Sequence, residues 1–372
     1  MKLRHFFRLK PHCLACASEE NGTFPLAINR VEVADSKGHE NESIIEGVIR
    51  CSNLLCQCEY PIIDGIPFLL PNVRETLAAS IGYIQARSDL CATTQSLLSD
   101  CCAPDSEFNV NRQYLSSYGW CHYGDLNPKN SDPNAGSTFQ AFQVMDDCLN
   151  SCRPNHSIWS DGGEVAIDLG CSVGRNSFAI ASKTNKLTLG VDLNFSMLKM
   201  ATRILRAGKV EYPLRRGGVV YDDIEFHVDF EHSDLVDFWA CDATQLPFAD
   251  DVFGRCNCMN TLDSVASPFA LLQSIARVLS KDGQATLACP YDWSSSATAI
   301  ESWIGGHSQR ADHRGSSDAV IRNLLTSPNQ GLSSLRLVSE QDNIPWVVRI
   351  HDRSQMHYSL HGIIIEKHGS KS

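Results

Sequence analysis

The sequence has no uninterrupted apolar run of the roughly 20 residues that a membrane-spanning helix needs. Its first segment, MKLRHFFRLKPHCLAC, also has no apolar core of the kind found in secretory signal peptides. Positive charge is scarce, because 32 Lys and Arg face 43 Asp and Glu, for a net charge of −11. A broad phosphate-binding surface needs clustered basic side chains, so this balance disfavours RNA as a partner. We therefore predict a cytoplasmic protein with no membrane partner.

The 16 cysteines do not suggest the disulfide framework of a small secreted protein, because they are scattered through a long chain with an ordinary apolar content of 43%. Most are predicted to be reduced and buried as small apolar side chains. A length of 372 residues exceeds one typical domain, so more than one unit is expected. The predicted units are a Cys-rich module at 1–72, a helical or loop connector at 73–134 and a main domain at 135–372.

Two close pairs of cysteines mark the amino-terminal module. Cys13 and Cys16 form a CxxC pair, and Cys51 and Cys56 form a second pair with the spacing CxxxxC. Four thiolates in two pairs suit tetrahedral zinc, and such a set leaves no coordination position open for a substrate. The pattern therefore predicts a structural zinc ion that the small module needs in order to fold.

The segment after the second pair, CEYPIIDGIPFLLP, resembles the short zinc-ribbon family that activates methyltransferases or is fused to them. The resemblance covers roughly residues 8–72 and implies a small β module. Two alternatives stay open: Cys58 or His12 could replace a ligand, or the cysteines could be ordinary reduced side chains around a β-turn. The positions that match the family pattern are Tyr60, Pro61, Asp64, Gly65, Ile66 and Pro67.

The main domain opens with EVAIDLGCSVGR, in which an apolar strand ends in an acid and a tight turn, and a helix-compatible stretch follows. Gly170 and Gly174 remove side chains where the backbone must approach a ligand, in the cleft of a doubly wound sheet. Ser172 and Arg175 stand where a GxGxxG motif would have glycines. A dinucleotide such as NAD is therefore disfavoured.

Three later predicted strands also end in polar residues. The stretch LTLGVD ends at Asp192, about 20 residues after Gly170, where a carboxylate can accept both ribose hydroxyls. The stretch VDFWACDA ends at Asp242 and Ala243, and the strand in CNCMN opens into a loop at Asn260. In order and motifs, these elements resemble the class I S-adenosylmethionine methyltransferases with a type 11-like domain, over essentially all of residues 160–368.

This resemblance implies an α/β, Rossmann-like fold with a mostly parallel seven-stranded sheet, helices on both faces and S-adenosylmethionine as cofactor. Two features depart from the family pattern. Ser172 replaces the middle glycine of the turn, and residues 208–236 are an insertion with strand-like sequence. The implied cofactor-binding residues are Asp168, Gly170, Cys171 and Gly174 around the methionine part, Asp192 and Leu193 at the ribose, Asp242 and Ala243 at the adenine, and Asn260 near the sulfonium.

Sulfonium methyl transfer is an in-line displacement that needs a base only if the acceptor carries a proton at attack. The catalytic candidates are His122, Tyr123, Asp263 and His351, although a lone histidine is more often a structural hydrogen-bonding group. The cluster YLSSYGWCHY before the main domain could be a lid over the cofactor or could pack between domains. Further acceptor-contact candidates are Tyr114, Tyr118, Trp120, Asp292, His307, Arg353, His357, Tyr358 and His361.

The function that the sequence favours is methylation of a small-molecule or specialised-metabolite acceptor. One alternative is an RNA base methyltransferase of the rRNA guanine type, since such enzymes also carry a four-Cys module before this fold. The other is a non-catalytic scaffold or activating partner that uses its ribbon. An intact set of cofactor residues disfavours the scaffold.

Overall fold

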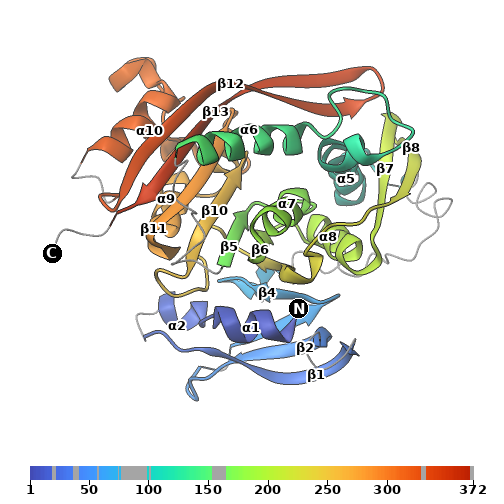
Figure 1. Ribbon diagram of the computed structural model, residues 1–372, viewed down its shortest axis with the longest axis vertical. Helices are drawn as coiled ribbons and strands as arrows, with labels where there is room; N and C mark the ends of the chain where they lie inside the picture. The colour runs from blue at the N-terminus through green and yellow to red at the C-terminus, as the bar shows by residue number, and fades with distance from the viewer. Residues whose placement is uncertain are drawn as a thin grey trace.

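In its described residues, the computed structural model contains one sheet of eleven strands and a separate two-stranded hairpin. In Figure 1 the amino-terminal module lies at one end of the molecule and continues into the sheet of the main domain. Of the described helices, none is both long and apolar enough to cross a membrane. The described residues are 1–18, 22–36, 42–56, 58–73, 75–76, 99, 102–152, 165–327 and 332–368.

Seven strands form the sheet of the main domain, namely β5 (Val165–Leu169), β6 (Leu187–Asp192), β9 (Val236–Cys241), β10 (Phe253–Met259), β11 (Leu279–Cys289), β12 (Leu335–His351) and β13 (Ser354–Lys367). Their spatial order is β9-β6-β5-β10-β11-β13-β12. The first five of these run parallel, and β13 is antiparallel to both of its neighbours. The predicted Rossmann-like, mostly parallel seven-stranded sheet is confirmed.

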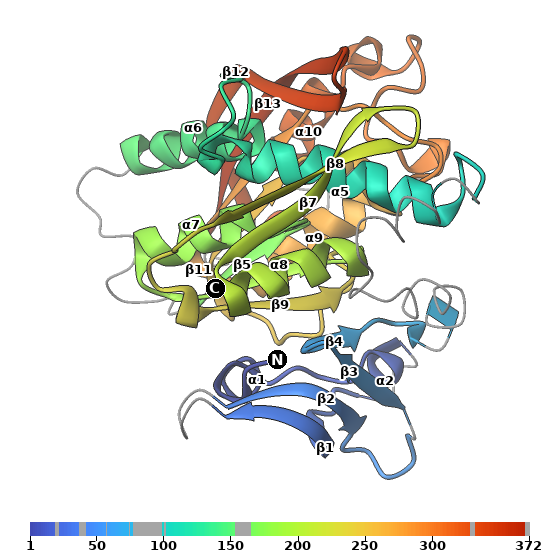
Figure 2. The same ribbon diagram turned by 90° about the vertical axis from the view of Figure 1, so that its right-hand side faces the viewer.

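Helices cover both faces of this sheet, which explains why every residue of β5, β9 and β10 is buried. In Figure 2, α6, α7 and α8 lie toward the viewer, while α9 and α10 lie behind the sheet. Phe178 of α7 packs edge to face on Phe238 of β9 with ring centroids 5.5 Å apart. The helices are α6 (Ser137–Cys152), α7 (Arg175–Thr184), α8 (Phe195–Ala207), α9 (Pro268–Val278) and α10 (Ser317–Thr326).

Local sequence sets the start of the helices that follow strands. The side chain of Asn194 accepts the N–H groups of Ser196 at 3.0 Å and Met197 at 3.3 Å, which caps α8. The hydroxyl of Ser267 caps α9 in the same way, with Pro268 in the first turn, where its missing N–H costs nothing. Each cap fixes where the preceding loop turns away from the strand ends.

The amino-terminal module consists of α1 (Leu3–Leu9), α2 (Leu14–Ser18), β1 (Leu26–Ser36), β2 (Glu42–Cys51), β3 (Glu59–Ile63) and β4 (Ile66–Leu69). Its four strands form an antiparallel meander. The last of them, β4, pairs in parallel with β9, with Phe68 opposite Ala240 and Leu69 opposite Cys241. The module therefore extends the sheet of the main domain instead of standing apart from it.

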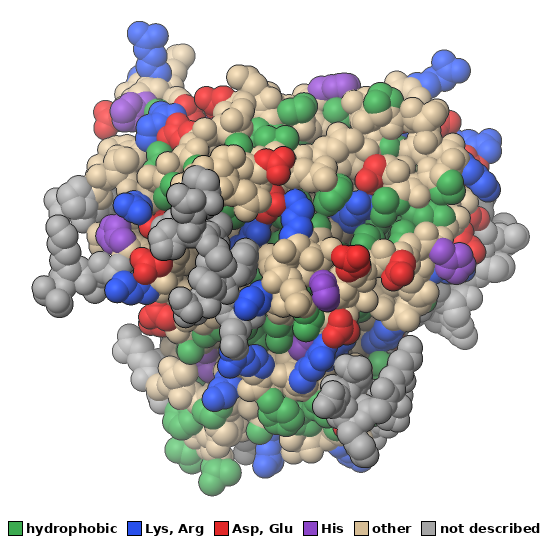
Figure 3. Space-filling view, in the orientation of Figure 1, with side chains coloured by type: hydrophobic (Ala, Val, Ile, Leu, Met, Phe, Trp, Pro, Cys, Tyr) green, Lys and Arg blue, Asp and Glu red, His purple; other side chains and the backbone are tan. Residues whose placement is uncertain are grey.

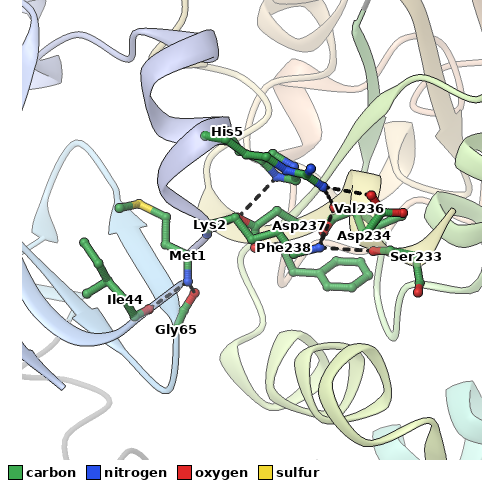
Figure 4. Close-up of polar contacts among 11 residues, drawn as sticks. Met1, Lys2, His5, Ile44, Gly65, Ser233, Asp234, Val236, Asp237 and Phe238 are labelled. Carbon is green, nitrogen blue, oxygen red and sulfur yellow. Dashed lines mark hydrogen bonds and ion pairs between the residues drawn. The ribbon is translucent and has the colours of Figure 1, made fainter. Parts of the chain in front are cut away.

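Polar contacts around Asp237 hold the module against β9, as Figure 4 shows. The backbone N–H of Lys2 donates to Asp237 Oδ2 at 2.7 Å, and His5 Nδ1 lies 3.5 Å from the same oxygen. The ammonium group of Lys2 donates to the carbonyls of Asp234 and Val236 at 2.8 and 2.7 Å. Because Asp237 is only 4% exposed, the contacts to its carboxylate are shielded from water and fix the position of α1.

The insertion at 208–236 forms the hairpin of β7 (Lys209–Gly217) and β8 (Val220–His227), which packs on α5 (Glu107–Tyr123). A Cβ on Gly119 of α5 would lie 2.5 Å from the ring of Tyr212, so only glycine allows this approach. Arg349 of β12 donates to the carbonyl of Arg215 at 3.0 Å. The hairpin thus joins α5 to the β12–β13 pair.

Candidate active site

The turn between β5 and α7 has three residues in the left-handed region, with φ of 67° at Gly170, 52° at Ser172 and 90° at Gly174. A Cβ on Gly170 would lie 2.1 Å from Thr261 Oγ1, and one on Gly174 would lie 2.5 Å from the ring of Phe238. Packing by the protein itself therefore requires both glycines. Ser172 adopts the left-handed conformation despite its side chain, at a cost of about 1 kcal/mol.

Asp192 lies at the end of β6, beside this turn. Its Oδ2 accepts the N–H of Ser172 at 2.9 Å, and its Oδ1 accepts the N–H of Asn194 at 2.8 Å. Each carboxylate oxygen has a further lone pair, so the group can also accept two ligand hydroxyls. Burial raises the pKa of Asp192. The next residue, Leu193, is 56% exposed and offers an uncovered apolar face.

Asp242 directly follows β9, the strand next to β6. Its Oδ1 accepts from the N–H of Thr244 at 2.8 Å and from the hydroxyl of the same residue at 2.6 Å. These bonds close a tight turn that presents Ala243, which is 7% exposed. Parallel neighbours end at the same edge of a sheet, so the carboxylates of Asp192 and Asp242 belong to one cleft edge.

Asn260 follows β10 with a φ of 55°. Its backbone N–H donates to the carbonyl of Ala288 at 2.7 Å. Both the Nδ2 and the Oδ1 atoms of its side chain are buried and have no hydrogen-bond partner in the part of the chain that the structure describes. A buried polar group without a partner costs about 1–3 kcal/mol, so a polar ligand at this position would explain it. The residues at this edge therefore fit a polar cofactor.

Asp168 belongs to a buried polar network beneath the turn. It accepts hydrogen bonds from Ser177 Oγ at 2.6 Å and from Asn257 Nδ2 at 2.7 Å, and Thr286 Oγ1 donates to Asn257 Oδ1 at 3.0 Å. Burial raises the pKa of Asp168 to about 6. Sequence analysis did not single out Asn257 or Thr286, although a polar residue within an apolar strand is a usable signal.

Helix α5 lies directly on the Gly-rich turn, because the hydroxyl of Tyr123 donates to the carbonyl of Val173 at 2.7 Å. The neighbouring His122 is 3% exposed, and its Nδ1 has no partner within the described residues. Burial, followed by the charge of Arg175, lowers the pKa of His122 to about 3. Its ring is therefore uncharged at neutral pH and is a weak base. Arg175 itself pairs with Asp125 at 3.3 Å.

Carboxylates also follow the next two strands. Asp263, in a short 3-10 turn after β10, is 3% exposed, and its Oδ2 accepts the N–H of Asp292 at 2.8 Å. Asp292 follows β11, and its own Oδ2 accepts the hydroxyl of Tyr358 from β13 at 2.8 Å. Tyr118 of α5 lies within electrostatic range of both Asp192 and Asp263. The structure thus brings α5 and β13 to the same strand ends.

The other histidine candidates have local structural partners. His351 ends β12, and its Nδ1 accepts the N–H of Arg353, which closes the β12–β13 turn. His361 Nδ1 lies 2.6 Å from the hydroxyl of Tyr291 after β11. His307 Nδ1 lies 3.1 Å from the carbonyl of Gly305. Of these three, only His361 has a partner that follows a strand at the cleft edge.

The four cysteines of the two predicted pairs come together in the amino-terminal module. The sulfur atoms of Cys13, Cys16, Cys51 and Cys56 all lie within 4.8 Å of one another, with Sγ–Sγ distances of 3.8 Å for Cys13–Cys56 and 3.7 Å for Cys16–Cys51. Tetrahedral zinc with Zn–S bonds of about 2.3 Å requires sulfur separations of roughly 3.8 Å. The cluster is therefore compatible with structural zinc. Neither His12 nor Cys58 belongs to this group.

Comparison with known proteins gives a match for the central part of the chain. Residues 167–287 match the family described as a methyltransferase domain. This segment contains the Gly-rich turn, the ends of β6 and β9, and Asn260. No curated protein matches this chain.

Several solved structures are distantly similar. The S-adenosylmethionine-dependent methyltransferase from Methanosarcina mazei is 17% identical, with 56% of this chain and 95% of that chain covered and a TM-score of 0.35. A putative sarcosine dimethylglycine methyltransferase from Galdieria sulphuraria is 11% identical, with coverages of 62% and 86% and a TM-score of 0.39.

The phosphoethanolamine N-methyltransferase 2 from Haemonchus contortus is 18% identical, with a TM-score of 0.34. The alignment covers 50% of this chain and only 34% of the Haemonchus protein. The segment that matches the methyltransferase domain includes the polar residues at the ends of β5, β6, β9 and β10. These four strands are neighbours in the sheet, so the polar residues lie along one edge of it. Residues 167–287 therefore form a methyltransferase domain with a class I, Rossmann-like fold.

Proposed function

We propose that this enzyme transfers the methyl group of S-adenosylmethionine to a small-molecule acceptor at the carboxyl ends of β5, β6, β9 and β10. The amide of Asn260 carries this proposal, because both of its polar atoms are buried without a partner among the described residues. A bound ligand would supply those partners. A chance packing defect would not explain why the unpartnered amide lies at the same sheet edge as the strand-end carboxylates.

The cofactor roles follow from position. The two oxygens of Asp192 each keep a lone pair for a ribose hydroxyl, and the exposed face of Leu193 suits the flat adenine. Asp242 and Ala243 follow the adjacent strand and border the same base. The proposed contacts to the methionine part and the sulfonium come from Asp168, Gly170, Cys171, Gly174 and Asn260.

Bound S-adenosylmethionine supplies a methyl group made electrophilic by a positively charged sulfonium. The protein contributes alignment and the exclusion of water, since in-line displacement needs no covalent intermediate. Tyr123 of α5 donates to the carbonyl of Val173 and so ties the helix to the turn. Helix α5 therefore acts as a cover over the reacting groups.

The amino-terminal module is proposed to bind one structural zinc ion through Cys13, Cys16, Cys51 and Cys56. Tyr60 supports this site, because its hydroxyl lies 3.4 Å from Cys13 Sγ. The role of the metal is to hold β1–β4 together, and β4 is the strand that borders β9. Zinc thus supports the strand that ends at the adenine side of the cleft.

An RNA acceptor is the alternative that the sequence left open. In Figure 3, Lys and Arg side chains are interspersed with Asp and Glu on the visible face and are not gathered into one patch. RNA binding would show a steep loss of affinity as salt concentration rises, because counterions are released from phosphates. Equilibrium binding to total RNA at low and high salt would separate the two functions.

Calorimetric titration tests the cofactor assignment. Purified protein is titrated with S-adenosylmethionine and S-adenosylhomocysteine, with NAD as the control, and metal content is measured on the same sample. We expect binding of both sulfur ligands with a Kd on the order of micromolar and none of NAD. Absence of binding to either sulfur ligand would overturn the proposed function and the residue roles.

A further inference from the structure

Two cysteines on α6 differ from the other described cysteines of the main domain. Cys148 and Cys152 are partly exposed, although cysteine is among the residue types most often found fully buried. Both touch an apolar cluster beneath the helix with one side, which does not explain sulfur on the accessible side. The other cysteines of this domain are buried as small apolar side chains, namely Cys171, Cys241, Cys256, Cys258 and Cys289.

The two thiols lie one turn apart on the same face of α6, at positions i and i+4. In a regular helix, such residues have Cβ atoms separated by about 5–6 Å. A disulfide requires a Cβ–Cβ separation of about 3.5–4.5 Å, so the helix opposes a direct bond between the two sulfurs. The same spacing lets two helical side chains bind one metal ion placed between them. The pair is therefore better suited to a bridging ion than to a disulfide.

A groove with a volume of about 440 Å³ gives access to both cysteines. It runs between α6 and β12, which lie side by side in Figure 1. The thiol of Cys148 donates to Gln341 Oε1 of β12 at 3.9 Å, a long contact even for sulfur. An ion can therefore enter from solvent and displace a weak interaction. The polar and thiol side chains of the groove are Asp147, Cys148, Ser151, Cys152, Ser339 and Gln341.

The number and type of ligands indicate which ion fits. Among the described residues, only the four-cysteine cluster brings three or more Cys, His, Asp or Glu ligand atoms within 4.8 Å of one another. Zinc at Cys148 and Cys152 would therefore lack the third and fourth protein ligands of a structural site. Hard ions such as Mg²⁺ and Ca²⁺ require oxygen ligands. Thiolates are soft ligands that select Cu(I), an ion for which two thiolates are a sufficient coordination set.

We propose that Cys148 and Cys152 form a second metal site, which binds one Cu(I) ion between two thiolates. Binding is an exchange of ligands without a change of oxidation state. Two S–H bonds break, two Cu–S bonds form, and the two protons pass to water. Asp147 is exposed on the same side of the helix and adds a negative charge that attracts the cation.

The ion joins the last two turns of α6. At the other end of this helix, Trp346 Nε1 of β12 donates to Thr138 Oγ1 at 3.0 Å and holds the first turn against the sheet. A bridge from Cys148 to Cys152 gives the last turn a comparable constraint. Because the ion binds the folded helix in preference to the unfolded chain, copper should raise the Tm of the protein.

An anaerobic copper titration of the full-length protein tests this site. The zinc content is measured first, Cu(I) is then offered as its bicinchoninate complex, and the loss of the coloured complex gives the copper bound per chain. Cys148→Ser and Cys152→Ser should each bind one copper ion fewer than the wild type. Cys148→Ala provides a second substitution in case serine disturbs the helix. The zinc content should not change when copper is added.

Ser151→Ala is the matched control, because Ser151 lines the same groove on α6 and carries no sulfur. This variant should bind as much copper as the wild type. X-ray absorption at the copper edge should show two sulfur neighbours in the wild type. Equal copper in the wild type and both cysteine variants, or no copper in any of them, would overturn the inference. Copper that enters only in exchange for zinc, with three or four sulfur neighbours, would assign it to the four-cysteine cluster and would also overturn it.

Discussion

Leu69 of the amino-terminal module pairs in the sheet with Cys241, the residue directly before Asp242. A strand of the module that contains the four-cysteine cluster is thereby the direct neighbour of β9, the strand that borders the proposed cofactor cleft. The pairing is parallel and includes Phe68 opposite Ala240. Loss of order in the module would leave the edge of β9 uncovered and weaken the support for the turn at Asp242.

Removal of a cysteine ligand should release the metal. We expect about one zinc per chain in the wild type, and loss of that zinc with a lower Tm in Cys13→Ser, because the free energy of metal binding contributes to the folding of a small module. Cys58→Ser is the matched control, since Cys58 lies outside the cluster, and it should keep the metal. Elemental analysis measures the zinc content, and thermal unfolding measures the Tm of each variant. Zinc lost from Cys58→Ser but kept in Cys13→Ser would reverse the ligand assignment.

Asp192→Ala should weaken S-adenosylmethionine binding by about 1–3 kcal/mol, because two hydroxyl acceptors are removed. The N–H groups of Ser172 and Asn194 would also lose their acceptor, so the turn itself would loosen. Calorimetry measures the change in Kd, and Asp147→Ala on the exposed face of α6 serves as the control. An unchanged Kd in the Asp192 variant would refute the ribose assignment.

Asn260→Gly should separate stability from function. Glycine accepts the φ of 55° without strain, and the change removes two buried atoms that lack partners. We expect the free energy of unfolding to stay equal or to rise by up to about 1 kcal/mol. Methyl transfer should nevertheless fall by at least tenfold. Chemical denaturation and turnover assays on one preparation measure the free energy of unfolding and the rate of methyl transfer. A large loss of stability would mean that Asn260 is a structural residue.

Tyr123→Phe should loosen α5 over the cofactor. The change removes the hydrogen bond to the carbonyl of Val173 and leaves that buried carbonyl without its side-chain donor, at a cost of about 1–3 kcal/mol. We expect lower stability and a weaker affinity for the cofactor. Tyr114→Phe on the outer side of the helix, where the side chain is 47% exposed, should change neither quantity. Equal effects from both variants would argue against this anchoring.

The raised pKa of Asp168 predicts a specific pH dependence. Burial raises this pKa to about 6, above the value of about 4 in an unfolded chain. Between these values the native state binds more protons, so the free energy of unfolding should fall as pH rises from about 4 through about 6. Asp168→Asn should show a smaller fall over this window in denaturation measured at several pH values. An equally steep fall would assign the effect to other carboxylates.

Much of the catalytic domain was predictable because its signals are local. The apolar strand before Gly170, the acids at Asp192 and Asp242 and the polar residue at Asn260 each lie at a strand end in the structure. The strand-like sequence of the insertion at 208–236 forms the hairpin of β7 and β8. The roles of these residues toward the cofactor stay predictions. Most of the connector at 73–134 before residue 102 lies outside the described residues.

Other parts of the site could not be predicted, because they depend on contacts between distant segments. The pairing of Asp292 with Tyr358 joins the loop after β11 to β13, and the bond from Tyr123 to Val173 joins α5 to the Gly-rich turn. The aromatic cluster also divides in the structure, since Trp120 and Tyr123 are buried while Tyr114 is exposed. Sequence pattern alone does not indicate which face of α5 meets the sheet.

The sequence by itself determined the succession of strands along the catalytic domain, the Gly-rich turn and the two cysteine pairs, because periodicity, turn residues and ligand spacing act over short stretches of chain. Only the tertiary structure decided that β4 continues the sheet next to β9, and that Asp263 accepts the N–H of Asp292 while Asp292 accepts the hydroxyl of Tyr358. Edge pairing and side-chain convergence depend on the packing of segments far apart in the chain, which short patterns do not encode.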